Sequence, residues 1–270
     1  MVQELTPEEH LDYLTASIRL MLWFTWHWLD THPAETFAEV VDTRVDIWRR
    51  TRLNPRHLDG PFNWRECPEW PALRERLEAL YRQHRAAGNA GAFEEAAAAL
   101  LAPYLPARVQ RDLADIRAGV DLAGYQCGSL RYNLAVDAAR PHCVRFHIAN
   151  ACWPASPFDD PRHFPLCFLD LMRQCAATFG VTEIGTGTWL NSSPKWLRLF
   201  PAEWTEHLEA PNVDVQGHYG FWGQFVTARR SFNHKLGRQF RETGVLPLPP
   251  RFSWCCITTM REHLRRQGYV

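Results

Sequence analysis

Apolar positions recur at helical spacing through the first 120 residues of the chain. The clearest segment opens with Thr6, Pro7 and Glu9, a capping box with proline in the first helical turn. From residue 11 to residue 28, apolar side chains surround most of the helix, which is typical of a helix buried between others. Further helices are predicted over 33–50, 70–87, 92–104 and 106–119, with a loop over 54–68. We therefore expect a helical bundle or cap over residues 1–124.

The pattern changes after residue 124, where short segments with β-branched and aromatic residues lie between turn signals. Strands are predicted over 128–136, 142–149, 181–190 and 213–226, and helices over 160–179, 195–200, 228–242 and from 258. Alternating strands and helices of this kind predict an α+β fold with an α/β-like C-terminal half. The N-terminal helical region would pack on a mixed sheet with flanking helices that covers residues 125–270.

Alternation along three predicted strands places ionisable side chains beside small or aromatic ones. If the three faces coincide, they line one cleft, and their glycines leave room for a ligand against the sheet. The alternative interpretation is a half-exposed sheet whose polar face meets water. The faces carry Arg145 and His147 on the first strand, Glu183, Gly185, Gly187 and Trp189 on the second, and His218, Gly220, Trp222 and Gln224 on the third.

The cleft hypothesis supplies candidate residues for acid–base chemistry and for substrate binding. A histidine beside a carboxylate can act as a general base with its orienting group, or form a structural hydrogen bond. The candidate catalytic residues are His147, Glu183 and His218. The candidate substrate-binding residues are Arg145, Asn150, Trp189, Asn191, Ser193, Tyr219, Trp222 and Gln224.

A metal site is the alternative use of the same three catalytic candidates. His147, His218 and Glu183 have the composition of a two-histidine, one-carboxylate set for iron or zinc. However, the chain contains no HxH or HExxH spacing. The primary prediction is therefore a site without metal.

One part of the chain resembles a known enzyme family. The segment 164–190, ending TEIGTGTWLN and followed by SSPKWLRLFP, resembles the helix, strand and short helix in the acyl-CoA-binding half of GNAT-type acyltransferases. The resemblance implies that strand 142–150 splays from its neighbour to admit the pantetheine arm, and that the following helix start holds the pyrophosphate. It also implies that His147 or Glu183 deprotonates an amine. The family's glycine-bearing phosphate loop, (Q/R)xxGx(G/A), is replaced by 150–164, which has three prolines and no glycine. The phrases GYQCGSLRY and HYGFWGQF resemble segments of bacterial proteins without an assigned activity.

Composition limits the class of protein. The chain has 46% hydrophobic and 22% charged residues, which is typical of a folded protein rather than a disordered one. Its formal net charge of zero makes nucleic acid an unlikely partner. The opening MVQELTPEEH lacks a secretory leader, and the apolar segment 18–29 is too short to span a membrane. We expect a cytoplasmic protein with reduced thiols and no membrane partner.

These observations lead to a functional expectation with two alternatives. We expect a small-molecule enzyme that transfers an acyl group from acyl-CoA, or from another acyl donor, to an amine or hydroxyl. The alternatives are an iron- or zinc-dependent oxygenase or hydrolase, and a non-catalytic protein that binds a small ligand.

Overall fold

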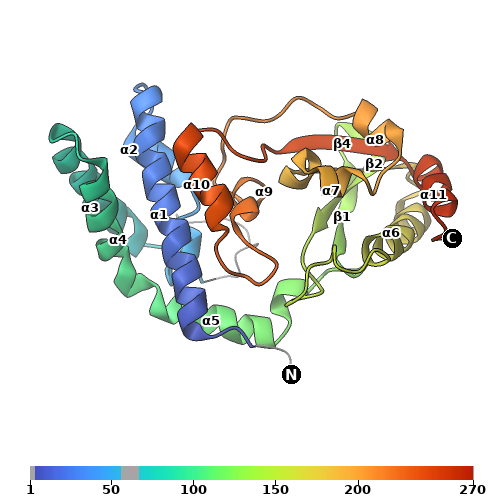
Figure 1. Ribbon diagram of the computed structural model, residues 1–270, viewed down its shortest axis with the longest axis horizontal. Coiled ribbons are helices and arrows are strands. Elements are labelled where there is room, and N and C mark those ends of the chain that lie inside the picture. The colour runs from blue at the N-terminus through green and yellow to red at the C-terminus, as the bar shows by residue number, and fades with distance from the viewer. Residues whose placement is uncertain (1–3, 56–66, 270) are drawn as a thin grey trace. The chain divides into compact units, whose positions relative to one another are not determined.

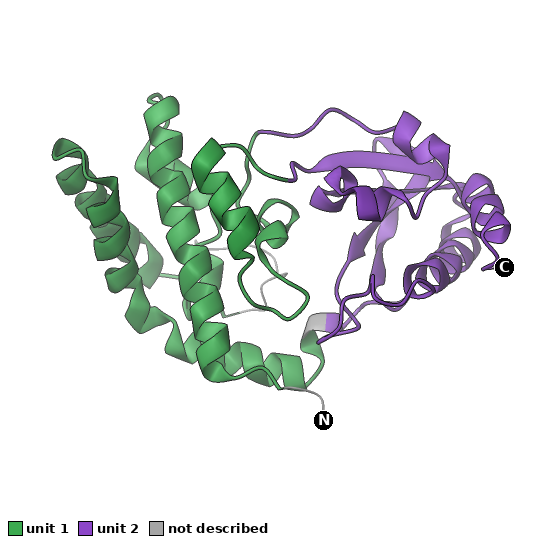
Figure 2. Cartoon of the chain, viewed as in Figure 1, with its two compact units in different colours: residues 1–121, 214–247 green, residues 122–213, 248–270 purple. Residues whose placement is uncertain are grey.

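The computed structural model describes residues 4–55 and 67–269, and the α+β class expected from the sequence is confirmed (Figure 1). The chain forms two units (Figure 2). Unit 1 comprises residues 1–121 and 214–247, and unit 2 comprises 122–213 and 248–270. Unit 2 thus begins close to the expected boundary, but residues 214–247 return to the helical unit instead of joining the sheet.

Unit 1 is helical, and its longest helix begins as the capping box predicts. The Thr6 hydroxyl accepts a hydrogen bond from Glu9 N (3.2 Å), and the Glu9 carboxylate accepts one from Thr6 N (3.0 Å). The unit contains α1 (Pro7–Thr31), α2 (Phe37–Thr43), the 3₁₀ helix Trp48–Arg50, α3 (Glu69–Ala86), α4 (Ala90–Leu101), the 3₁₀ helix Ala102–Tyr104, α5 (Pro106–Arg117), α9 (Tyr219–Trp222), the 3₁₀ helix Gly223–Phe225 and α10 (His234–Thr243). The helix expected over 33–50 is shorter, and most of the loop expected over 54–68 lies outside the described residues.

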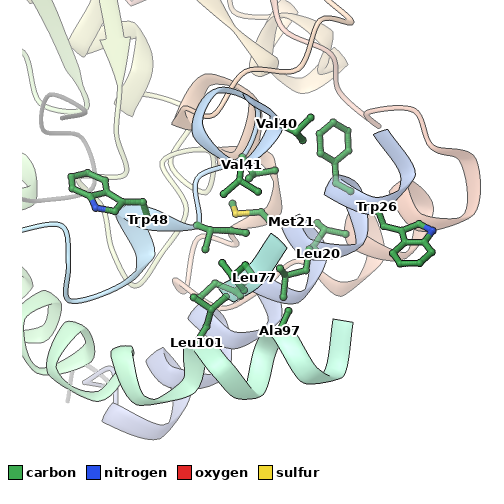
Figure 3. Close-up of a cluster of buried hydrophobic side chains, with 14 of the residues drawn as sticks. Leu20, Met21, Trp26, Val40, Val41, Trp48, Leu77, Ala97 and Leu101 are labelled. Atoms are coloured by element: carbon green, nitrogen blue, oxygen red, sulfur yellow. The ribbon is translucent and has the colours of Figure 1, made fainter. Parts of the chain in front are cut away.

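Apolar side chains from α1 to α4 form the core of unit 1 (Figure 3). Helix α1 contributes residues from most of its circumference, as its pattern predicted. Trp70 of α3 is fully buried and its indole N–H donates to Asp42 Oδ1 (3.0 Å). Burying such large side chains stabilises the unit because each removes ~150–250 Å² of aromatic surface from water.

The segment 214–247 completes this core, and the strands predicted over 213–226 are wrong. Trp222 and Phe240 pack against Phe24 of α1, with ring centroids 5.5 and 5.6 Å apart. Gly217 makes the close approach possible: its N–H donates to Thr43 O (2.7 Å), and a Cβ there would lie 2.5 Å from Val45 O. The aromatic residues at 221, 222 and 225 fit both a strand pattern and one buried helical turn, so alternation alone misled the prediction.

Unit 2 contains a four-stranded mixed sheet. Its strands are β1 (Leu130–Asp137), β2 (Arg140–Ile148), β3 (Glu183–Thr188) and β4 (Arg251–Cys256), in the order β1-β2-β3-β4. β1 and β2 are antiparallel, β2 and β3 are parallel, and β3 and β4 are antiparallel. β4 was not predicted, because it follows the proline-rich stretch 246–250. In Figure 1, β4 runs across the view while β1 and β2 run steeply down from it, as expected of a strongly twisted sheet.

Helices cover one face of this sheet. The parallel pair β2 and β3 is joined by α6 (His163–Phe179), the kind of crossover that parallel strands require. α6 ends at Gly180, which has φ 64°, as the sequence predicted. The remaining helical elements are the 3₁₀ helices Val120–Leu122, across the unit boundary, and Trp189–Ser192, with α7 (Pro194–Leu197), α8 (Ala202–Glu206) and α11 (Ile257–Arg266). Val144, Phe146 and Ile184 form a core with Phe168 and Met260 from these helices.

Among the described residues, no helix combines the length and apolar character needed to cross a membrane.

Candidate functional site

The opposite face of the sheet carries several of the predicted site residues, and we call it the polar face. Register places Arg145 of β2 opposite Gly185 of β3, and Gly185 opposite Trp254 of β4. His147 lies two residues further along β2, on the same face as Arg145, and both are exposed. The prediction that Arg145, His147, Glu183 and the two β3 glycines share a face is therefore confirmed.

Arginines and aromatic rings are layered on the polar face. The Arg145 guanidinium lies 4.9 Å from the Phe252 ring centroid and is ion-paired with Asp137. Trp254 contacts two side chains: the Arg140 guanidinium lies 4.4 Å from its ring centroid, and the His207 ring stacks on it with centroids 3.7 Å apart. Cation–π contacts of this kind hold the side chains against the sheet.

The space above Gly185 is filled by protein. A Cβ on Gly185 would lie 2.9 Å from Phe252 Cζ, 3.0 Å from Ser253 O and 3.1 Å from Cys143 Sγ. The expectation that the β3 glycines leave room for a ligand is therefore wrong at Gly185, because β4 supplies a phenylalanine that the sequence pattern had not placed in the sheet.

This packing predicts opposite results for alanine at the two β3 glycines. Gly185→Ala should lower the free energy of unfolding by about 1–3 kcal/mol, because Phe252 must shift and a backbone oxygen cannot. Gly187→Ala should be neutral or slightly stabilising, because its Cβ would meet only Phe252 Cδ2, at 3.8 Å. Urea unfolding followed by hydrogen exchange of β3 peptides measures both. Equal midpoints for the two variants would contradict the described position of Phe252.

His147 and Glu183 do not form a pair. Glu183 is opposite Cys143, four residues from His147 along β2, which corresponds to roughly 13 Å of extended strand. His147 Nε2 instead forms a 2.7 Å hydrogen bond with Asn133 Oδ1 of β1. The His–Glu dyad expected from alternation is therefore wrong, since strand faces coincide but positions along the strands do not.

Pairing between β2 and β3 ends partway along both strands. The last paired residues are Arg145 and Gly185, although β2 continues to Ile148 and β3 to Thr188. Each strand stays paired with its outer neighbour over this stretch, β2 with β1 and β3 with β4. The Thr186 hydroxyl donates to Phe146 O (2.7 Å), so a side chain links the strands where the ladder has ended. We call this unpaired stretch of the two strands the β2–β3 split.

Acidic residues lie just before the start of α6. Asp160 Oδ1 accepts a hydrogen bond from Arg162 N (2.8 Å), and Asp159 Oδ2 accepts one from Ser156 N (3.0 Å). These carboxylates are favourable near the helix N-terminus. They also oppose a second anion there, so this helix start does not fit the pyrophosphate that the family resemblance implied.

A cluster of polar side chains around His163, at the same helix start, was not among the predicted site residues. His163, the first residue of α6, has Nε2 2.7 Å from Ser129 Oγ. Cys152 Sγ lies 3.4 Å from its Nδ1 and 3.5 Å from its Nε2, so the sulfur is not aligned with either lone pair. Burial, helped by Asp160, raises the pKa of the Cys152 thiol, which disfavours the thiolate needed for nucleophilic attack. Spacing could not reveal the cluster, because its members come from three separate segments.

Both polar atoms of the Asn191 side chain form hydrogen bonds within unit 2. Its Nδ2 donates to Thr186 O (2.9 Å) and Arg251 O (2.8 Å). Its Oδ1 accepts from the indole N–H groups of Trp196 (3.0 Å) and Trp204 (3.2 Å). A fully buried amide with four internal partners is a structural residue, so the substrate role predicted for Asn191 is replaced by a packing role.

Three more predicted binding residues lie in unit 2. Asn150 bridges its own loop, donating to Ala155 O and accepting from Cys152 N, both at 2.9 Å. Trp189 opens the 3₁₀ helix after β3 and Ser193 precedes α7, where it makes no side-chain cap. None of the three lies in a strand of the sheet.

The other four predicted residues belong to unit 1. Trp222 is buried and donates from its indole to Arg44 O (3.0 Å), and Gln224 is buried and donates to Phe221 O (2.8 Å). His218 caps α9, where its Nδ1 accepts from Gly220 N (3.1 Å). Tyr219 follows it as the first residue of α9. The single cleft built from three strands is therefore wrong, because 213–226 is not a strand and does not join the sheet.

The alternative metal site is not assembled either. It needs His147 and Glu183 close together, and these two residues are separated along the sheet. Within the described part of the chain, no group of three or more histidine, cysteine, aspartate or glutamate side chains is placed to hold a metal ion.

Comparisons with protein-family models, with curated proteins and with solved structures found no match to this chain.

Proposed function

We propose that unit 2 is a small-molecule acyltransferase domain that binds an acyl thioester at the β2–β3 split and transfers its acyl group to an amine or hydroxyl. The observation that supports this is the end of pairing at Arg145 and Gly185 while both strands continue. An extended, amide-containing arm can form main-chain hydrogen bonds along such a strand edge. The GNAT-type resemblance of 164–190 implies the same arrangement.

The start of α6 favours a donor that places no pyrophosphate there. Asp159 and Asp160 bond local backbone N–H groups and would repel phosphate oxygens. We therefore propose that the thioester arm is recognised at the split. The nucleotide part of coenzyme A, where present, lies away from this helix start.

His147 is the proposed general base. It is exposed, and its Nε2 is directed to Asn133 Oδ1. We propose the tautomer in which Nε2 donates to this amide oxygen, which makes Nδ1 the basic nitrogen. Asn133 then orients the ring, and Nδ1 would take the proton of the attacking amine or hydroxyl. Arg145 supplies positive charge on the same face, where it would stabilise negative charge developing on the thioester oxygen.

Thioester binding and thioester consumption test the two parts of this proposal separately. The full chain is titrated with acyl-CoA and with the matching acyl-pantetheine, and thermal midpoints are recorded. We expect both thioesters to raise the midpoint, and the pantetheine form to suffice, because no phosphate site is required. Thiol release in the presence of a panel of amines measures transfer.

His147→Gln should lower thiol release by ~10²-fold or more while the thioester-induced midpoint shift remains. His142→Gln, an exposed histidine at the other end of β2, is the matched control and should retain activity. No stabilisation by any thioester would overturn the proposal. Stabilisation without thiol release would overturn acyl transfer and favour the non-catalytic alternative.

A further inference from the structure

Arg131 of β1 lies directly opposite the proposed general base. Register pairs Arg131 with His147 across the antiparallel β1–β2 ladder, so both side chains stand on the polar face. Residues directly opposite each other in such a ladder have Cβ atoms about 4.5–5.5 Å apart. A ligand bound by Arg131 can therefore reach the His147 ring.

The Arg131 guanidinium lies over an aromatic ring and has no carboxylate partner among the described residues. Its Cζ is 5.2 Å from the centroid of the Tyr125 ring, and the side chain is half-buried. A guanidinium held in this way keeps its N–H donors for a planar oxyanion, which it binds through paired hydrogen bonds. Arg131 is therefore suited to bind a carboxylate.

The nearby acidic groups of the polar face do not offset this charge. Asp137 is ion-paired with Arg145. Glu183 is four residues from His147 in strand register, which is roughly 13 Å of extended strand. Among the described residues, the surroundings of His147 thus carry net positive charge, which attracts a carboxylate and repels a simple ammonium ion.

We propose that the acceptor of the acyl group is an amine that also carries a carboxylate, as an amino acid does, and that Arg131 binds this carboxylate. The inference rests on the acyl transfer proposed for unit 2 and names its second substrate. The neutral amine nitrogen attacks the thioester carbonyl carbon, so that a C–N bond forms and the C–S bond breaks. His147 Nδ1 takes the proton from the amine and returns it to the departing sulfur, and the products are an N-acyl amino acid and a free thiol.

Binding is tested without turnover, by two pairs of probes whose members differ by one carboxylate. Phenylalanine is compared with phenethylamine, and γ-aminobutyrate with propylamine, by the thermal midpoint of the full chain and by hydrogen exchange of β1 and β2 peptides. We expect the amino acid of at least one pair to raise the midpoint and slow exchange, and its amine to do neither. Equal responses to amino acid and amine in both pairs would overturn the inference.

Substitutions at Arg131 test whether this residue binds the carboxylate. Arg131→Gln should weaken the response to the amino acid by about tenfold or more, whereas Arg131→Lys keeps the charge and should retain part of it. Arg173→Gln, at a side chain 73% exposed on α6, is the matched control and should leave the response unchanged. Full retention of the response in folded Arg131→Gln would overturn the inference.

Turnover separates the inference from the function on which it rests. With acyl-pantetheine as donor, Arg131→Gln should raise KM for the amino acid by about tenfold or more and leave KM for the thioester nearly unchanged. A raised KM for acyl-CoA but not for acyl-pantetheine would show that Arg131 binds a phosphate of the donor, and would overturn the inference while acyl transfer stands. No thiol release with any acceptor would overturn acyl transfer and the acceptor named here, and the midpoint responses would still show whether Arg131 binds a carboxylate.

Discussion

Asn191→Leu is expected to lower the free energy of unfolding of unit 2 by about 4 kcal/mol or more. Leucine fills a similar volume but leaves the buried carbonyl group of Thr186, the partly buried carbonyl group of Arg251 and two buried indole N–H groups without this partner. Each such group costs about 1–3 kcal/mol. Urea unfolding read by hydrogen exchange of β3 and β4 peptides measures the loss.

The neighbouring Ser192→Ala is the matched control for this prediction. It removes one hydrogen bond, from Ser192 Oγ to Pro249 O (2.6 Å), and should cost no more than about 1 kcal/mol. Asn191→Asp separates the two sides of the network. It keeps an acceptor for the indoles but turns an oxygen toward two carbonyl groups. Burial and these carbonyl oxygens should raise the pKa of the new carboxyl in the folded chain, so stability should fall as pH rises above the ordinary pKa of aspartate. An Asn191→Leu loss as small as that of Ser192→Ala would contradict the four-bond network.

Asp112→Ala is expected to destabilise unit 1 by about 3–5 kcal/mol. Asp112 is 5% exposed and its Oδ2 accepts hydrogen bonds from His10 Nε2 and Arg108 Nε, both at 2.9 Å. Removing the carboxylate takes a buried acceptor from a fully buried guanidinium, and breaking such a pair is costly. Asp115→Ala, on the same helix and half-buried, is the control and should cost less than about 1 kcal/mol.

The Asp112 carboxylate should also make the stability of unit 1 depend on pH. Burial alone would raise the pKa of Asp112, but the hydrogen bond from His10 and the charge of Arg108 outweigh it and lower the pKa below the ordinary value. A depressed pKa means that the unfolded chain binds the proton more readily, so the stabilisation is complete above the ordinary value of about 3.9 and is lost as pH falls below it. Asp112→Asn should therefore show a flatter loss of stability in acid. If the unsubstituted chain and Asp112→Asn lost stability equally as pH falls, this assignment would be contradicted.

The helical part of the fold could be read from the sequence because its signals are local. The capping box at Thr6 and the glycine stop at Gly180 lie within a few residues of the helix ends they define, and both are confirmed. β4 had no such signal. A strand at the edge of a sheet, after a proline-rich stretch, is recognised only through its partner β3.

The sequence predicted correctly which side chains of β2 and β3 share a face of the sheet, but not where they lie along the strands. Alternation correctly placed Arg145 and Gly185 on one face, since side-chain direction in a strand is a local property. The distance from His147 to Glu183 depends on register, which the crossover through α6 sets and alternation does not report. His218 and Trp222 were assigned to the sheet because one buried helical turn and a short strand can share the same apolar pattern.

The return of residues 214–247 to unit 1 has a consequence for synthesis of the chain. When residue 121 has left the ribosome, α1 still lacks Trp222 and Phe240, which cover Phe24. All of unit 2 except 248–270 is made before these partners arrive. Because synthesis adds about 5–20 residues per second, the apolar surface of α1 around Phe24 stays exposed for several seconds. Nascent chains halted before residue 240 should therefore bind chaperones that recognise apolar surface, and chains halted beyond residue 247 should release them.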